Sequence, residues 1–125
     1  MEIHESAENY LETILMLSNK NPQVRSIDVA NELAFSKPSV SVAMKKLREN
    51  DYVEFDDLGY IRLTEAGLAI AKDVYERHKI ISDLLVSIGV SEETALEDAC
   101  RVEHVISRET FEKLKEYYLG SVDMR

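Results

Sequence analysis

The sequence lacks the features that mark secreted, membrane-spanning and disulfide-stabilised proteins. Cys100 is the only cysteine among 125 residues, so no disulfide can form within the chain and a reducing compartment is expected. Apolar residues nowhere continue for about 18 positions, so no membrane-spanning helix is expected. The N-terminal stretch MEIHESAENY has neither the basic nor the apolar region of a signal peptide. Together these absences predict a cytoplasmic protein without membrane association.

Motifs of common enzyme classes are missing as well. The chain has no Gly-rich phosphate loop, no nucleophile elbow of the GxSxG type and no HExxH metalloprotease motif. It also has no internal repeat and no low-complexity linker, and its hydrophobic fraction of 45% is that of a globular protein. We therefore expect a globular protein that is not an enzyme and holds no organic cofactor.

Charge is distributed unevenly along the chain. The formal net charge is −9, and residues 1–19 hold four glutamates without a lysine or arginine. Residues 35–48 hold three lysines and one arginine without an acid, whereas residues 92–118 hold eight acids against four bases. A local basic segment matters more for binding nucleic acid than the sum of charges does. The basic segment is thus the candidate nucleic-acid surface.

Hydrophobic periodicity predicts six helices and one β-hairpin. The expected helices cover residues 7–18, 27–33, 37–50, 65–88, 92–105 and 108–119, and the expected hairpin joins residues 52–55 and 60–63. Expected N-caps are Ser6, Ser26, Ser36, Thr64, Ser91 and Ser107, while Gly59 and Gly89 supply positive φ. This order predicts a mainly α fold, with a winged helix-turn-helix domain over 1–64 and a second, helical domain over 65–125.

The third expected helix has the composition of a DNA-reading helix. In a helix-turn-helix the N-terminal residues of the second helix face the major groove, where hydroxyls donate to phosphates and base edges and lysines neutralise phosphates. The expected DNA-binding residues are Ser36, Lys37, Pro38, Ser39, Ser41, Lys45 and Lys46, with Arg48 on a later turn. Asp56 and Asp57, expected at the wing tip, would repel phosphate. The alternative is a small helical domain whose basic helix only faces solvent.

A second group of residues combines three kinds of metal donor. Cys100, Glu103 and His104 stand at i, i+3 and i+4, which is one face of a helix. A thiolate, a carboxylate and an imidazole together suit a first-row transition metal better than calcium or magnesium. His78, late in the long helix, is a further candidate, and Glu12 and Asn9 would add oxygen ligands from the first helix. Alternatively, Cys100 is a small core residue and the others are structural or solvated.

Four segments, spread over nearly the whole chain, resemble sequence motifs of a single protein family. They are Asp98-Ala99-Cys100-Arg101-Val102-Glu103-His104-Val105-Ile106-Ser107, Tyr75-Glu76-Arg77-His78-Lys79, Asn9-Tyr10-Leu11-Glu12-Thr13-Ile14 and Ser36-Lys37-Pro38-Ser39-Val40-Ser41. In this order and spacing they resemble the diphtheria toxin repressor family of iron- and manganese-activated repressors. The resemblance implies a homodimer on a palindromic operator of double-stranded DNA near metal-uptake genes. It also implies metal ligands at Asn9, Glu12, His78, Cys100, Glu103 and His104.

The sequence departs from both metal branches of that family. Asn9 stands where the iron branch has Met and the manganese branch has Asp, Glu12 matches the manganese branch, and Cys100 matches the iron branch. Ser82 and Leu96 replace ancillary-site ligands of the iron branch, so that second site is expected to be missing or altered. With no SH3-like third domain in its 125 residues, the chain resembles the shorter manganese regulators. The expected ions are Mn²⁺ or Fe²⁺, with Co²⁺, Ni²⁺ or Zn²⁺ able to substitute in vitro.

Apolar residues on the last helices predict that the helical domain over 65–125 is a dimerisation domain as well as a metal-binding domain. The residues expected at the interface are Leu84, Leu85, Ile88, Val102, Val105, Phe111 and Leu114, because together they exceed what one small helical half can bury. The alternative function is a winged-helix transcriptional regulator that does not sense metal, in which Glu12, His78 and Glu103 are ordinary surface residues.

Overall fold

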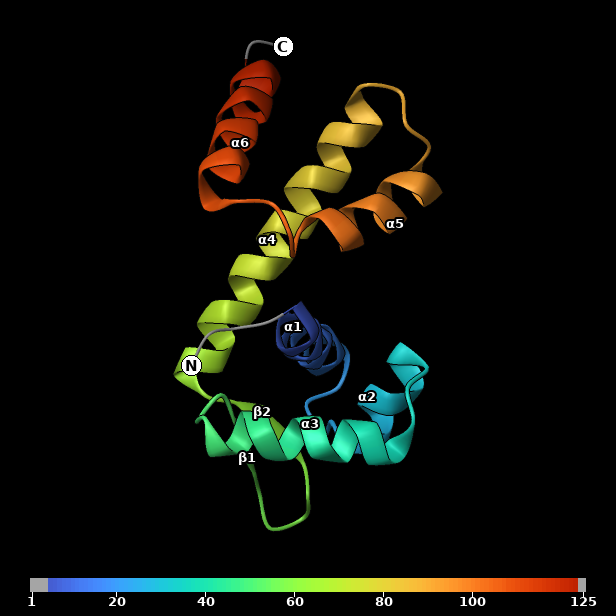
Figure 1. Cartoon of the computed structure of the whole chain (residues 1–125), viewed down its shortest axis with the longest axis vertical. Coiled ribbons are helices and arrows are strands. Elements are labelled where there is room, and N and C mark those ends of the chain that lie inside the picture. Colours follow the sequence, from blue (N-terminus) through green and yellow to red (C-terminus); the bar gives the residue numbers. More distant parts are fainter. Residues whose placement is uncertain (1–4, 124–125) are drawn as a thin grey trace. The chain divides into compact units, whose positions relative to one another are not determined.

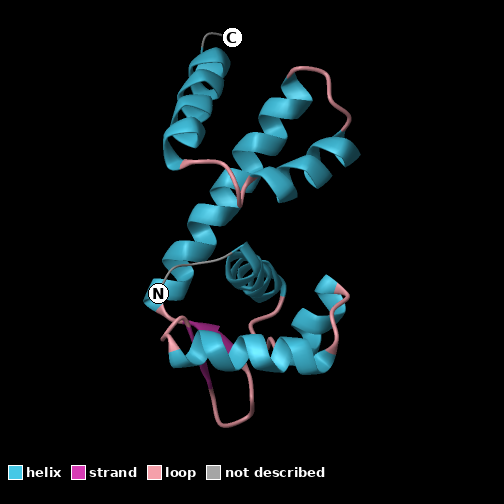
Figure 2. Cartoon of the chain, in the orientation of Figure 1, coloured by secondary structure: helices cyan, strands magenta, loops and turns pink. Residues whose placement is uncertain are grey.

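The computed structural model describes residues 5–123, in which helices and one β-hairpin are joined by loops and turns (Figures 1 and 2). Its elements in chain order are α1 (Glu5–Lys20), α2 (Ser26–Leu33), α3 (Lys37–Glu49), β1 (Val53–Phe55), β2 (Ile61–Leu63), α4 (Glu65–Ser87), α5 (Glu92–Val102) and α6 (Arg108–Asp123). The mainly α fold with a winged helix-turn-helix is therefore confirmed. No helix within the described residues is both long enough and apolar enough to cross a membrane.

The chain forms two compact units whose boundary falls inside α4, between Lys72 and Asp73. The N-terminal unit comprises α1, α2, α3, the hairpin and the first two turns of α4. The C-terminal unit comprises the rest of α4 together with α5 and α6. Each unit has its own buried cluster, so each is described by itself.

The core of the N-terminal unit explains why its helices form where they do. Apolar side chains at helical spacing are buried from α1, α2 and α3, and the hairpin adds one residue from each strand. The residues of this cluster are Tyr10, Leu11, Ile14, Val24, Val29, Ala30, Val40, Met44, Leu47, Val53, Ile61 and Ala71. One continuous core thus holds α3 against the rest of the unit and leaves its opposite face exposed.

The turn between α2 and α3 is set by one left-handed residue and one cap. Ala34 ends α2 with φ 56°, and the amide of Phe35 then donates to the carbonyl of Ala30. Ser36 begins α3, because its hydroxyl oxygen accepts a hydrogen bond from the amide of Ser39 at 3.3 Å. The predicted cap at Ser36 is confirmed, and the turn is short enough for a helix-turn-helix.

The wing is a short antiparallel hairpin with a tightly bonded loop. Val53 pairs with Leu63 and Phe55 with Ile61, and Gly59 adopts φ 84° as predicted. The Asp56 carboxylate accepts hydrogen bonds from the amides of Leu58 and Tyr60, both at 2.9 Å. The Asp56 carboxylate therefore closes the loop on itself, and the expected repulsion of phosphate by Asp56 and Asp57 stays a prediction.

The start of α4 packs tightly on the residue before the wing. Thr64 caps α4 by accepting from the amide of Gly67 at 3.1 Å, and its hydroxyl donates to the carbonyl of Asp51 at 2.6 Å. A Cβ atom on Gly67 would overlap the backbone carbonyl of Tyr52. Only glycine fits there, because the obstacle is backbone and cannot rotate away.

The C-terminal unit buries a smaller cluster between α4, α5 and α6. Ile81, Ala99 and Phe111 form it. Ser91 and Ser107 cap α5 and α6 as predicted, by accepting from the amides of Thr94 and Thr110. Phe111 is fully buried within its own unit, so its predicted place in a dimer interface is wrong.

Three predicted helix boundaries are also corrected. Ser26 lies inside α2, whose N-cap is Arg25, because the Arg25 amide donates to the Asp28 carboxylate at 2.8 Å. Ser6 lies inside α1, since the helix already includes Glu5. α5 ends at Val102 rather than Val105, and this earlier end shapes the candidate site described next.

Candidate metal centre and DNA-reading surface

A buried carboxylate between two imidazoles forms the centre of the C-terminal unit. The Nδ1 atom of His78 lies 2.9 Å from Oε2 of Glu103, and Nε2 of His104 lies 3.2 Å from Oε1. Glu103 is 0% exposed, and the His104 side chain is 2% exposed. One carboxylate therefore uses both oxygens to hold imidazoles from two separate segments of the chain.

The early end of α5 creates this arrangement. The amide of Glu103 still donates to the carbonyl of Ala99 at 2.9 Å, so Glu103 completes the last turn as the C-cap. His104 and Val105 then form a turn that leads into α6, with the Val105 amide bonded to the Val102 carbonyl. His104 thus reaches Glu103 from the turn rather than from a continuing helix.

The donors fit a divalent transition metal in type and in spacing. A buried carboxylate needs a compensating positive charge, because desolvation penalises its ionised form. A cation bound by the same nitrogen and oxygen atoms would supply that charge. Neighbouring ligands of a six-coordinate ion at about 2.1 Å lie about 3 Å apart. The distances of 2.9 and 3.2 Å agree with that spacing, and they are also ordinary hydrogen-bond distances.

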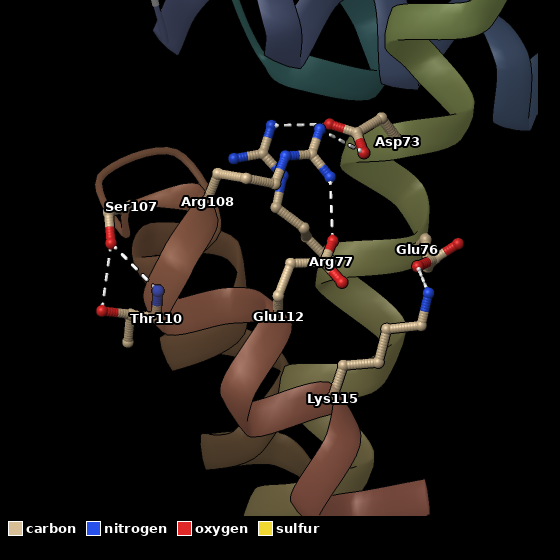
Figure 3. A network of polar contacts seen from close by, with 8 residues as sticks. All are labelled: Asp73, Glu76, Arg77, Ser107, Arg108, Thr110, Glu112 and Lys115. Carbon is tan, nitrogen blue, oxygen red and sulfur yellow. Dashed lines mark hydrogen bonds and ion pairs between the residues drawn. The ribbon is translucent and has the colours of Figure 1, made fainter.

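Ion pairs between α4 and α6 fix the helix that carries His78 (Figure 3). Arg108 contacts Asp73 at 3.0 Å and Glu112 at 3.2 Å, and Asp73 also pairs with Arg77 at 3.3 Å. The hydrogen bond to Glu112, followed by the charge of Asp73, raises the pKa of Arg108. Arg77 directly precedes His78 in α4, so this network restrains the backbone next to one imidazole.

A second pair restrains α4 one helical turn from the first. Lys115 contacts Glu76 at 2.6 Å, and this hydrogen bond raises the pKa of the lysine (Figure 3). The pairs are largely exposed, so each one contributes little to stability. Their effect is mainly to set the position of α6 along α4.

The other predicted ligands belong to α5 and α1. Cys100 is exposed on α5, one turn before Glu103. Asn9 and Glu12 lie on α1 in the N-terminal unit, one turn apart, where the Asn9 carbonyl accepts a hydrogen bond from the Thr13 hydroxyl at 2.8 Å. The roles of these three residues as metal ligands stay predictions.

The outer face of α3 carries the predicted DNA-binding residues. Val40, Met44 and Leu47 are buried on the inner face. The predicted contact residues are all exposed, and they are Ser36, Lys37, Pro38, Ser39, Ser41, Lys45 and Lys46. The hydroxyls of Ser36 and Ser39 are hydrogen-bonded to each other at 2.8 Å, so the start of the helix presents a fixed pair of hydroxyls.

The hairpin carries two cation–π contacts that the sequence did not reveal. The guanidinium of Arg48 lies 5.5 Å from the Phe55 ring centroid, and that of Arg25 lies 4.6 Å from the Tyr60 ring. Such contacts hold a guanidinium against an aromatic face without removing its charge. Arg48 therefore connects α3 to the wing while staying positive.

Comparisons with known proteins cover both units. Residues 2–58 match the family described as "Iron dependent repressor, N-terminal DNA binding domain", and residues 64–121 match "Iron dependent repressor, metal binding and dimerisation domain". An uncharacterized HTH-type transcriptional regulator of Methanocaldococcus jannaschii is 37% identical over 113 residues, covering 89% of this chain and 90% of the relative. The transcriptional regulator MntR of Escherichia coli O157:H7 is 32% identical over 111 residues, covering 89% and 72%.

The fold is also similar to that of a solved structure. The manganese regulator SloR superposes with a TM-score of 0.79 at 28% sequence identity. The match covers 94% of this chain and 54% of the SloR chain, so this chain spans about half of that structure.

Proposed function

The chain belongs to the iron-dependent repressor family, and from this premise we propose that it represses metal-homeostasis genes when manganese or ferrous iron is bound. It is a metal-dependent, DNA-binding transcriptional repressor that acts as a homodimer and is not an enzyme. One observation carries the metal-sensing part: Glu103 is buried between the imidazoles of His78 and His104. We place the protein in the cytoplasm, since its operator is genomic DNA.

We propose that the metal is held by His78, Glu103 and His104 together with ligands from elsewhere in the chain. Imidazole nitrogen and carboxylate oxygen donors suit Mn²⁺ and Fe²⁺. The carboxylate also supplies a negative charge that attracts the divalent cation. The remaining proposed ligands are Asn9, Glu12 and Cys100. When bound, the ion supplies the positive charge that lets several buried donors lie close together.

The proposed switch follows from where those residues lie in the sequence. Glu12 belongs to the DNA-reading unit, whereas Glu103 and His104 belong to the dimerising unit. Carboxylates brought together without a cation repel one another, so a ligand set drawn from both units favours one arrangement only when the ion is bound. A dimer then presents two α3 helices at one separation, which a palindrome of fixed half-site spacing selects. Metal and operator affinities should be coupled by about 1–3 kcal/mol.

The function is tested by DNA binding with and without metal. Operator sequences are first selected from random or genomic fragments in the presence of Mn²⁺, and their affinity is then measured by fluorescence anisotropy. We expect Mn²⁺ and anaerobic Fe²⁺ to raise the affinity at least tenfold, and Mg²⁺ at the same concentration to leave it unchanged. Equal affinity in all conditions would instead favour the alternative, a winged-helix regulator that does not sense metal.

Cys100 provides a test of metal preference. A thiolate is a softer donor than a carboxylate and favours iron, cobalt, nickel or zinc over manganese, so Cys100→Glu should raise the response to manganese relative to iron. Wild-type protein should respond to both ions, with manganese bound more weakly. In Co²⁺-loaded wild-type protein, we expect a sulfur-to-metal charge-transfer band in the near ultraviolet, which Cys100→Ala removes. A Co²⁺ spectrum without this band, together with a normal response of Cys100→Ala, would show that Cys100 is not a ligand.

A further inference from the structure

The outer face of α3 contains two apolar side chains among its polar residues, Pro38 in the first turn and Val42 in the middle of the helix. Val42 is 57% exposed, although valine is β-branched and is neither a strong helix former nor favoured at the surface. It lies on the face opposite the buried residues Val40, Met44 and Leu47. Nothing in the packing of the N-terminal unit therefore explains a valine at this position.

Val42 occupies the middle of the DNA-reading face. It stands one helical turn after Pro38 and one turn before Lys45 and Lys46. The hydroxyl pair of Ser36 and Ser39 precedes it, and the lysines follow it, so phosphate-binding groups lie on both sides along the helix. A side chain between two such groups points at base edges when the helix enters a major groove.

The chemistry of the valine side chain selects one base. Thymine is the base that carries a methyl group in the major groove, and apolar side chains contact it there. A valine can form no hydrogen bond with the donors and acceptors of the other base edges and leaves them unsatisfied. We propose that Val42 determines operator specificity by packing against the methyl group of a thymine in each half-site. This inference rests on the proposed function, because it requires that α3 reads an operator.

The test removes the methyl group from the DNA rather than from the protein. Each thymine of the selected palindrome is replaced in both half-sites by deoxyuridine, and anisotropy is measured with Mn²⁺ for wild type, Val42→Ala and Met16→Ala. Burial of one methyl group corresponds to about fourfold in affinity, or roughly 15-fold for two half-sites. We expect a loss of this size at one thymine position for wild type and Met16→Ala, and almost none for Val42→Ala. Met16 is the matched control, because it is 41% exposed on α1 of the same unit.

A second variant asks whether specificity can be changed. Glutamine hydrogen-bonds to the N6 and N7 edge of adenine, so selection with Val42→Gln should enrich adenine at the position where wild type selects thymine. Uniform loss at every thymine, or the same deoxyuridine effect in wild type and Val42→Ala, would overturn the assignment of Val42. Failure of the proposed function looks different, because then either no sequence is enriched by any variant, or the same sequences are enriched with and without Mn²⁺. The assignment of Val42 would also be overturned if wild type and Val42→Gln selected the same half-site.

Discussion

The two units of this chain solve the problem of burying apolar surface differently. The N-terminal unit has one large buried cluster that draws on three helices, both strands and the start of α4. The C-terminal unit has a small cluster of Ile81, Ala99 and Phe111, while Ile88, Val105 and Tyr117 are each at least 70% exposed. A unit that leaves this much apolar surface in water needs a partner to cover it. The difference is consistent with a C-terminal unit that dimerises, whereas the N-terminal unit folds around its own core.

The two units also use polar contacts for different purposes. In the N-terminal unit they close turns, as Asp56 does in the wing and Thr64 does at the start of α4. In the C-terminal unit they join helices through ion pairs, such as Arg108 with Asp73, and they surround Glu103 with imidazoles. The exposed pairs of the C-terminal unit therefore set the positions of helices, whereas the buried carboxylate of Glu103 is the group on which a bound cation would act directly.

Removal of one core side chain should expose this difference most strongly. Phe111→Ala deletes the largest member of the small C-terminal cluster and should lower the free energy of unfolding by about 4 kcal/mol. Leu11→Ala, in the larger N-terminal core, should cost about 3 kcal/mol. Lys113→Ala is the control, since its side chain is 73% exposed on the same helix as Phe111. Urea denaturation measures all three, and equal losses for Phe111→Ala and Lys113→Ala would contradict the assigned core.

A change at a glycine should affect the N-terminal unit alone. Gly67→Ala places a Cβ against the backbone of Tyr52, and such overpacking should cost about 3 kcal/mol. Gly120→Ala meets no atom within 4 Å on α6, so it should be neutral or raise stability by about 0.5–1 kcal/mol through helix propensity. Thermal unfolding compares the two variants, and a stable Gly67→Ala protein would show that the start of α4 packs differently.

Loss of the central carboxylate should remove the metal response while preserving the N-terminal unit. Glu103→Gln keeps the shape of the side chain but removes its charge, and should weaken Mn²⁺-activated operator binding by about 100-fold. His104→Ala should likewise abolish the response to both metals. Glu97→Gln is the control, because Glu97 is exposed on the same helix. Calorimetric titration with Mn²⁺ gives the readout, and unchanged metal affinity in Glu103→Gln would exclude Glu103 as a ligand.

The smallest expected effect concerns the basic face of α3. DNA affinity should fall steeply with salt despite the net charge of −9, because lysines meet phosphate locally. Lys45→Ala should reduce the slope of log affinity against log salt by about 1, and Lys20→Ala at the end of α1 should leave it unchanged. An affinity independent of salt would contradict the placement of α3 on DNA.

Local patterns in the sequence predicted the elements well where short-range chemistry decides them. Ser36, Thr64, Ser91 and Ser107 cap helices as expected, and Gly59 has the positive φ that the hairpin requires. The predictions that were wrong concern competition between neighbours. A cap at Ser26 was expected, but the amide of Arg25 bonds to the carboxylate of Asp28 and makes Arg25 the N-cap instead.

Long-range packing decided what the sequence left open. Periodicity alone assigned Phe111 to a dimer interface, since an apolar residue on an amphipathic helix suits either an internal core or a partner. It also continued α5 through Val105, whereas the chain turns after Val102 to bring α6 onto α4. Because that turn follows from packing, no pattern around Glu103 could predict it.

The sequence by itself thus determined the order of elements, the family, and the residue types available for metal and DNA. Those properties reside in spacing, caps and charge, which act over a few residues. Only the tertiary structure decided that Glu103 is fully buried and that its two oxygens meet His78 and His104. These contacts depend on which segments pack together although they are dozens of residues apart in the sequence. A carboxylate needs a compensating charge only when it is buried, and this burial exists only after the packing is complete.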